Sequence, residues 1–232
     1  ANLLEAGLDG IELQLAHGHL LQQFLSPIAN EREDKYGGNL ENRMRIVIET
    51  AIAVRQMIGA DRTMGVRISA DEFLQGGLTL NDMCTVVLKL ASAVQLDFVN
   101  VSHSAYHGSY TISTQIADMA FSNQRFRYLT EAISTNLDGL ERKPVIMSVC
   151  RYNSVELAED MLATGKADMI GMARAHVADP ELVNKAYSGN VEDTIPCIGC
   201  NQGCADMLAQ SLAISCLTNP RAGKEADWPA PF

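Results

Sequence analysis

The feature that most constrains this chain is the alternation of short apolar runs with longer amphipathic segments. Five strand candidates are separated by stretches of helical period. The strands are expected at residues 10–15, 64–69, 97–102, 143–150 and 167–172. Strand–helix–strand repetition predicts a parallel sheet with right-handed crossovers, and therefore an α/β fold.

Helix signals lie between these strands. Apolar residues share one face from Asn39 to Ile58, and Gly59 follows as a stop. Thr79-Leu80-Asn81-Asp82 has the pattern of a capping box that opens a helix to about Val94. Further helices are expected at residues 124–137, between Ser154 and Gly165, and from Pro180 onward.

Two architectures fit this pattern, an open doubly wound sheet and a (β/α)8 TIM barrel. No GxGxxG follows a strand, which weakens the nucleotide-binding open sheet. Polar residues collect just past the C-terminal ends of most strands, where a barrel builds its active site. They are Gln14, His17, His19, Arg67, Ser69, Asp71, His103, His107, Arg151 and Arg174. We therefore expect a barrel of which only the C-terminal five βα units are present.

The ends of the chain favour the same view. The first seven residues, Ala1 to Gly7, resemble the last turns of a helix and lack both Met and a signal-peptide pattern. Residues 228–232 resemble the start of a linker. We expect an internal piece of a longer protein, with three barrel units before residue 1. A chain that simply begins with a helix is the alternative.

Charge and hydropathy restrict the partners. Lys and Arg number 18 against 28 Asp and Glu, for a net charge of −10 over 232 residues. Nucleic-acid binders usually show the opposite balance or a basic patch. No run approaches 18 apolar residues, so no membrane-spanning helix is expected. We expect a cytoplasmic protein with neither nucleic acid nor membrane as partner.

The cysteines form the sharpest local motif. Four of the six follow the spacing Cys197-x2-Cys200-x3-Cys204-x11-Cys216. Three thiolates on one loop and a fourth nearby suit a [4Fe–4S] cluster. Structural zinc more often uses two separated Cys-x2-Cys pairs, and disulfides suit small secreted domains. Both remain rivals. Cys84 and Cys150 are expected to be small buried apolar residues.

Residues 197–204 and 216–222 resemble the cluster segment of the iron–sulfur branch of the old yellow enzyme family. This branch includes dienoyl-CoA reductases, trimethylamine dehydrogenase and N-demethylases of N-methylproline and proline betaines. The likeness extends over about residues 5–225 and is carried further by four segments. These are His17–Pro27, Asn30–Arg43, Gly65–Ser69 and Gly171–Arg174.

The resemblance implies a domain organisation. Residues 1–190 would be the C-terminal part of an FMN-binding TIM barrel, with its fourth to eighth strands. Residues 191–232 would be the iron–sulfur cluster segment and the start of a linker. The family's first three strands would lie outside this chain. So would its C-terminal nucleotide-binding domains, with any FAD or NAD(P)H that they hold.

The resemblance also implies a flavin site. Arg151 and Arg174, with Gly171, would hold the FMN phosphate, because barrels often build a phosphate site after their last two strands. Arg67 would lie near the flavin N1–C2=O edge, and Gln14 would contact the cofactor. The alternatives are ion pairs, of Arg67 with Glu12 or Asp71 and of the other two arginines with acidic neighbours.

The candidate catalytic residues are His17, His19, His103 and His107. In the family, the position of His17 often binds a substrate oxygen and that of His19 is usually a proton-donating tyrosine. Either His103 or His107 matches a histidine of the dienoyl-CoA reductases. Tyr106 and Tyr110 in the same stretch suit a quaternary ammonium. The alternatives are a hydrogen-bonded structural histidine at position 19 and an ordinary surface loop.

The implied protein is an FMN- and [4Fe–4S]-dependent oxidoreductase that moves hydride between a substrate carbon and flavin. Oxidative N-demethylation of an N-methylated amine or betaine is favoured, because His19 replaces the enoate reductases' tyrosine. NAD(P)H-dependent reduction of an enoate or 2,4-dienoyl-CoA is the alternative, and a non-catalytic barrel domain is a third. The expected partners are a small-molecule substrate and an electron donor or acceptor domain or protein, with a homo-oligomer left open.

Overall fold

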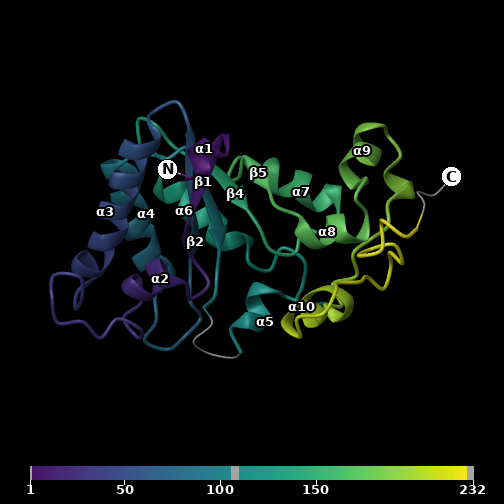
Figure 1. Ribbon diagram of the computed structural model, residues 1–232, viewed down its shortest axis with the longest axis horizontal. Helices are drawn as coiled ribbons and strands as arrows, with labels where there is room; N and C mark the ends of the chain where they lie inside the picture. The colour runs from purple at the N-terminus through teal and green to yellow at the C-terminus, as the bar shows by residue number, and fades with distance from the viewer. Residues whose placement is uncertain (1, 106–109, 229–232) are drawn as a thin grey trace.

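The computed structural model describes residues 2–105 and 110–228. Its five strands form one parallel sheet in the order β1-β2-β3-β4-β5 (Figure 1). They are β1 (Gly10–Leu15), β2 (Thr63–Ser69), β3 (Phe98–Ser102), β4 (Val145–Ser148) and β5 (Met169–Ile170). A doubly wound sheet reverses its strand order at a switch point. The strictly sequential order instead matches consecutive units of a (β/α)8 barrel, so the α/β prediction is confirmed and the barrel is favoured.

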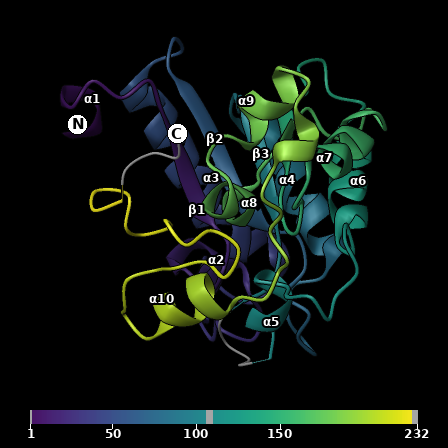
Figure 2. The same ribbon diagram turned by 90° about the vertical axis from the view of Figure 1, so that its right-hand side faces the viewer.

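The connecting helices wrap the outer face of this sheet (Figure 2). They are α3 (Leu40–Ile58), α4 (Leu80–Ala93), α6 (Arg127–Asn136) and α7 (Val155–Leu162). α3 packs against α4, and α4 packs against α6. The shorter helices are α1 (Asn2–Glu5), α2 (Leu20–Leu25), α5 (Ile112–Gln115), α8 (Ala173–Ala178), α9 (Leu182–Tyr187) and α10 (Met207–Ala209). No described helix has the length and apolar character needed to cross a membrane.

Local signals in the sequence account for the long helices. The Asn39 side chain accepts a hydrogen bond from the Asn42 amide at the start of α3. Gly59 ends this helix at a φ of 80°, which glycine adopts freely. At α4 both hydrogen bonds of the predicted Thr79–Asp82 capping box are present. These boundaries are therefore confirmed.

Other boundaries differ from the expectation for backbone reasons. The helix expected from residue 124 begins at Arg127, because Gln124 has a φ of 56°. The strand expected over 143–150 is β4, which stops at Ser148 and is followed by φ angles of 82° at Cys150 and 63° at Arg151. The strand expected over 167–172 shortens to β5. The helices α2, α5, α8 and α10 are too short for periodicity to reveal.

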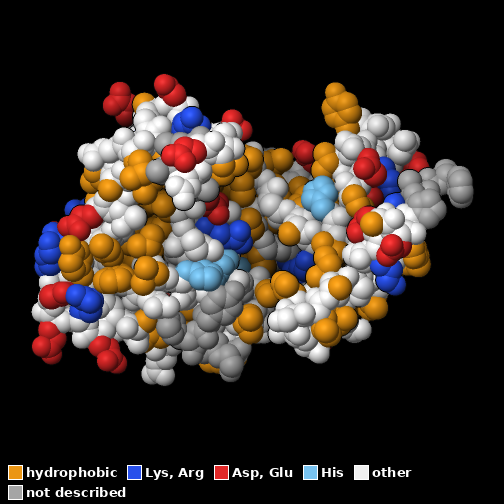
Figure 3. Space-filling view, viewed as in Figure 1, with side chains coloured by type: hydrophobic (Ala, Val, Ile, Leu, Met, Phe, Trp, Pro, Cys, Tyr) orange, Lys and Arg blue, Asp and Glu red, His pale blue; other side chains and the backbone are white. Residues whose placement is uncertain are grey.

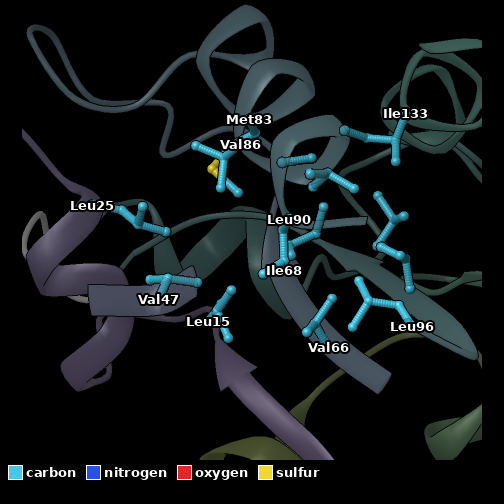
Figure 4. Close-up of a cluster of buried hydrophobic side chains, with 14 of the residues drawn as sticks. Leu15, Leu25, Val47, Val66, Ile68, Met83, Val86, Leu90, Leu96 and Ile133 are labelled. Atoms are coloured by element: carbon cyan, nitrogen blue, oxygen red, sulfur yellow. The ribbon is translucent and has the colours of Figure 1, made fainter. Parts of the chain in front are cut away.

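The apolar core lies between the sheet and its helices. Alternate strand residues such as Leu15, Val66 and Ile68 point toward the helices and are fully buried. They meet Val47 of α3 and Leu90 of α4 in one continuous cluster (Figure 4). This packing fixes the opposite strand residues on the inner face of the sheet.

That inner face carries a polar row. The strand register aligns Gln14, Arg67, Asn100, Met147 and Met169 across the five strands. One layer nearer the N-terminal ends of the strands, Gly65 pairs with Phe98. A Cβ atom at Gly65 would lie 2.2 Å from the Phe98 ring, so this ring occupies the space that a side chain there would need.

Residues 195–228, which we call the cysteine segment, lie beside α8 and near α5 (Figures 1 and 2). A π-helical turn (Gln202–Asp206) leads into α10, and the remainder is irregular. The buried residues of this segment are Gly199, Gly203, Asn219 and Ala222. None of these carries a large apolar side chain, so apolar packing contributes little here.

Candidate functional site

A cavity of about 350 Å³ opens at the C-terminal ends of β2 to β5. Arg67, Asn100 and Ser102 line it from β2 and β3, and the loops after β4 and β5 supply two further arginines. The cysteine segment closes one side with Cys197 and Gly199. In Figure 3, basic and histidine side chains gather in the hollow between the helix-covered part and the cysteine segment. The cavity is large enough for a small ligand or cofactor.

The polar row at the base of this cavity is incompletely hydrogen-bonded. Within the described residues, three buried atoms of the row have no hydrogen-bond partner: Gln14 Oε1, Arg67 Nε and Asn100 Oδ1. The other amide atom of Asn100, Nδ2, donates to Glu12 Oε2 at 2.9 Å. Buried polar atoms are rarely left unpaired, and each one costs free energy. The row therefore suits a ligand that offers both donors and acceptors.

Arg67 forms no ion pair within the described part of the chain, although Glu12 and Asp71 are its acidic neighbours in sequence. Glu12 is bound by Asn100 instead. The Asp71 carboxylate accepts from the Phe73 amide. The guanidinium of Arg67 is thus available to an anionic or electron-rich group in the cavity.

Arg151 is one of the two arginines that the loops after β4 and β5 supply to the cavity. Its Nε donates to Asn123 Oδ1 at 3.1 Å, and its Nη1 donates to the Asp118 carbonyl. Cys150 and Arg151 both adopt left-handed backbone, which is costly for residues with a Cβ atom. Such strain is typical of functional sites. Both residues line the cavity.

Arg174 lies in the first turn of α8 and lines the cavity. Its Nη1 donates to Asn201 Oδ1 at 2.5 Å. Just before it, the Gly171 amide donates to the Ser148 carbonyl at 2.9 Å, and a Cβ atom there would lie 2.8 Å from Val149 Cγ1. Only glycine lets these two strand ends approach so closely. Within the described residues, neither Arg151 nor Arg174 pairs with a carboxylate.

His17 lies beside the polar row but is buried, with 5% of its surface exposed. Its Nε2 is 2.7 Å from Ser102 Oγ, and its backbone amide donates to Ser69 Oγ. Burial, reinforced by the nearby Arg67 charge, lowers the pKa of His17 to about 3. The ring is therefore neutral near pH 7 and offers a hydrogen bond rather than a proton.

Two other candidate histidines, His103 and His19, lie close enough to His17 to contribute to the lowering of its pKa. His103 is buried between Phe73 and Phe126, with ring centroids 5.6 and 4.2 Å away, and its Nε2 lies 2.9 Å from the Thr114 carbonyl. Burial lowers its pKa to about 4. This environment favours a structural role. His19 is exposed at the start of α2.

His107 and Tyr106 lie outside the described residues. Tyr110 is largely exposed, and its hydroxyl donates to the Phe73 carbonyl at 3.3 Å. The predicted ammonium-binding role of this stretch stays a prediction.

A second, smaller cavity of about 20 Å³ is lined by the four motif cysteines. They are Cys197, Cys200, Cys204 and Cys216, and all four are free thiols. Among the described residues, no three His, Cys, Asp or Glu side chains form a group that could hold a metal ion. The four cysteines thus line one cavity, but within the described residues their side chains do not form such a group.

The cysteines differ in their surroundings. Burial raises the pKa of the Cys197 thiol. At Cys216 the effect of burial is outweighed by hydrogen bonds from the Thr218 hydroxyl and from the Thr218 and Asn219 amides, so the thiol pKa is lowered. Cys84 and Cys150 pack against the apolar core but are half-buried rather than buried as expected, and Cys150 also lines the larger cavity.

The residues present fit the two groups that the resemblance implies. Two guanidinium groups without carboxylate partners suit a phosphate, and the unpaired atoms of the polar row suit the edge of a flavin ring. Four free thiols around one cavity are the donor set of a [4Fe–4S] cluster.

Sequence reasoning missed three asparagines at the site. Asn100 is a polar residue within an apolar strand, and its alternation with Val99 and Val101 is the signal that places it on the inner face. Asn153 donates to the Cys197 carbonyl at 3.0 Å. Asn201 contacts Arg174. No local pattern marks these last two, because their partners are distant in sequence.

Comparison with known proteins agrees with this geometry. Residues 2–193 match the model of the NADH:flavin oxidoreductase / NADH oxidase family. A metal reductase of Desulforamulus reducens is 40% identical over 96% of this chain and 32% of its own length. An N,N-dimethylglycine/sarcosine dehydrogenase of Chromohalobacter salexigens is 36% identical over 95% of this chain and 31% of its own.

Among solved structures, a 2-naphthoyl-CoA reductase superposes with a TM-score of 0.87 at 28% identity. The match covers 97% of this chain and 33% of that one. The chain thus spans about a third of the length of the relatives it matches. Its sheet is a part of the TIM barrel of such flavoenzymes. From the family match and these relatives, the chain belongs to the NADH:flavin oxidoreductase / NADH oxidase family.

Proposed function

We propose that the intact protein is an FMN- and [4Fe–4S]-dependent oxidoreductase that oxidises an N-methyl group of a small amine or betaine. The observation that carries the flavin part is the cavity with Arg67, Arg151 and Arg174 on its wall. The family match and the 36%-identical N,N-dimethylglycine/sarcosine dehydrogenase support the reaction class. FMN supplies hydride transfer, and the cluster supplies single-electron transfer to another domain or protein.

The roles of the chain's own residues follow from their placement. Arg151, Arg174 and Gly171 hold the phosphate, where two planar guanidinium groups can each donate two hydrogen bonds. Arg67 places a positive charge beside the flavin edge, and Gln14 and Asn100 offer the row's unpaired oxygens to ring N–H groups. Cys197, Cys200, Cys204 and Cys216 ligate the cluster. Residues 1–190 form the barrel part and 191–232 the cluster part of the chain.

His17 suits substrate binding rather than proton transfer. Because its pKa is about 3, the neutral ring can hydrogen-bond a substrate carboxylate but does not supply a proton readily. Loss of hydride to the flavin from the N–CH3 group of an amine whose nitrogen carries a lone pair needs no protein acid, because that lone pair forms the new C=N bond. It leaves an iminium carbon that water hydrolyses to formaldehyde and the demethylated amine. His19 stands where an enoate reductase would present its tyrosine, which is harmless to this reaction. We also propose that the intact protein is cytoplasmic.

A second candidate function is NAD(P)H-dependent reduction of an activated C=C bond. The likeness to the 2-naphthoyl-CoA reductase structure favours it. It requires a proton donor near the reacting carbon, and the exposed His19 is the residue for that role.

One experiment separates the two. Anaerobic mixing of the oxidised intact protein with N-methylproline or dimethylglycine should bleach the flavin absorbance and release formaldehyde. An oxidised flavin after such mixing, with turnover of a dienoyl-CoA by the NADPH-reduced protein, would establish the second function instead. Arg67→Gln should slow the bleaching, whereas Arg125→Gln, at an exposed arginine, should not. Release of FAD alone on denaturation would refute the FMN assignment.

A further inference from the structure

The two cavities are not separate sites, because one loop forms a wall of both. Cys197 and Arg174 line the larger cavity and the cysteine cavity alike. Gly199, between two of the motif cysteines, also lines the larger cavity. The loop from Cys197 to Asn201 therefore touches the proposed phosphate end of the flavin site from one side and the proposed cluster from the other.

Asn201 is the principal contact between this loop and Arg174. Its Oδ1 accepts from Arg174 Nη1, and its Nδ2 donates to the Ile116 carbonyl, both at 2.5 Å. Ile116 lines the larger cavity too. The backbone of Asn201 is left-handed, with a φ of 62°, and it follows Cys200 directly. Its side chain thus joins this loop to α8 and to the C-terminal end of α5.

The same loop contacts the other arginine. A Cβ atom at Gly199 would lie 2.8 Å from Arg151 Nη1, so loop backbone and guanidinium are in close approach. Asn153, two residues after Arg151, donates to the Cys197 carbonyl at 3.0 Å. Both arginines proposed for the phosphate are therefore positioned in part by the loop that carries the cysteines.

The loop has little apolar packing of its own to hold it. Its buried residue is Gly199, and Ile198 is 43% exposed. Ligation of its two cysteines would fix its backbone, since metal binding supplies order that a small core does not. Donors that are already fixed bind an anion more tightly than donors that must become ordered on binding.

We propose that cluster loading and FMN binding are thermodynamically linked through this loop, with Asn201 as the positioning residue that transmits the effect to Arg174. The inference rests on the proposed function. Linkage is reciprocal: if the cluster strengthens FMN binding, FMN strengthens retention of the cluster by the same factor. A coupling of about 10-fold lies within the usual range for linked sites.

The test measures FMN affinity of the intact protein, not turnover. Cluster-loaded and chelator-treated protein, both freed of flavin, are titrated with FMN under anaerobic conditions, and quenching of flavin fluorescence gives the dissociation constant. We expect about 10-fold weaker binding after cluster removal. Asn201→Gly keeps the left-handed backbone without strain and removes the side chain. In this variant the loaded protein should bind FMN about as weakly as the cluster-free wild type. Gln202→Ala, at the exposed next residue, should retain the full difference.

The reciprocal effect, that of FMN on retention of the cluster, can be measured as well. Iron loss to a chelator should be slower with FMN than with riboflavin, which lacks the phosphate, and Asn201→Gly should remove this protection. Equal FMN affinity of the loaded and cluster-free wild type would overturn the linkage while leaving the proposed cofactor intact. Linkage that persists in Asn201→Gly would overturn the role of Asn201. Failure of every form to bind FMN would refute the proposed function itself, and the linkage with it.

Discussion

The strand–helix part of the molecule and the cysteine segment are held together by different forces. In the first, side chains such as Leu15, Ile68, Met83 and Leu90 are fully buried between sheet and helices. In the second, the buried residues are two glycines, an alanine and an asparagine, while Leu208, Leu212 and Leu217 are exposed. The strand–helix part should therefore resist unfolding through apolar burial, whereas the cysteine segment lacks that source of stability.

This difference shows which interactions can hold each part of the chain in a single conformation. Burial of apolar surface stabilises the strand–helix part by itself. The cysteine segment offers hydrogen bonds, such as those of Asn201 and Asn219, and four thiols around one cavity. Without a core, such a segment would depend on the proposed cluster for a single conformation. The free energy of unfolding of the strand–helix part and the iron content of the cysteine segment should therefore respond to different substitutions.

The largest expected effect is at the thiols. Cys200→Ala in the intact protein should reduce bound iron from about four per chain to near zero, because three thiolates leave one cluster corner without its ligand. Limited proteolysis should then cut within residues 195–228 while the strand–helix part resists. Iron analysis and mass spectrometry of the fragments measure both. Cys84→Ala, at a half-buried thiol on the core, is the matched control. Equal iron loss in the two variants would contradict the cluster assignment.

The core gives the converse test. Leu90→Ala removes a fully buried side chain and should lower the free energy of unfolding by about 2–5 kcal/mol. Urea denaturation measures it, and iron content below the transition should stay unchanged. Leu88→Ala, two residues away at a side chain that is 36% exposed, should cost much less. Similar losses in the two variants would show that α4 does not bury the face described above.

Acid should act on the strand–helix part through two buried histidines. His17 and His103 have pKa values of about 3 and about 4, below the ordinary 6.5. Below pH 6.5 the unfolded chain takes up protons that the folded chain does not, so stability falls as the pH falls. Each ring should account for about 2 kcal/mol of lost stability at pH 5 relative to pH 7.

Urea denaturation at pH 7 and pH 5 tests this effect. His103→Gln should shrink the difference between the two pH values by about 2 kcal/mol. His176→Gln, at an exposed histidine, should leave the difference as it is. A pH difference that His103→Gln does not alter would place the acid sensitivity elsewhere in the molecule.

The smallest effect concerns the contact between the two parts. Gly199→Ala adds a methyl group 2.8 Å from Arg151 Nη1, and Gly189→Ala adds one with no neighbour within 4 Å. Both glycines have left-handed backbone, so both variants carry about 1 kcal/mol of backbone strain. Only Gly199→Ala should also weaken FMN binding, by about 5-fold if the displaced guanidinium costs about 1 kcal/mol. Equal FMN affinities in the two glycine variants would show that Arg151 does not bind the phosphate.

Much of the fold could be predicted because its signals are local. Asn39, Gly59 and the Thr79–Asp82 box mark helix ends by interactions within a few residues. Short apolar runs between the helical segments indicated the strands, and Arg67 falls near the end of one of them. The spacing of the four cysteines predicted that they share a site, and they line one cavity.

The rest of the site depends on contacts between distant residues. His103 is enclosed by Phe73 and Phe126, which come from two other loops, so its sequence neighbours could not show that it is buried. Asn201 and Ile116 are 85 positions apart. The left-handed backbone at Cys150 and Arg151 shortened a predicted strand, because neither residue type announces that conformation.

The pairing of Gly65 with Phe98 limits how the layer beneath the polar row can change over evolutionary time. The Phe98 ring lies one layer beneath Asn100 and fills the space that a side chain at position 65 would occupy. A larger residue at position 65 therefore requires a smaller one at position 98. The two positions should change together, and a single substitution at position 65 should be selected against.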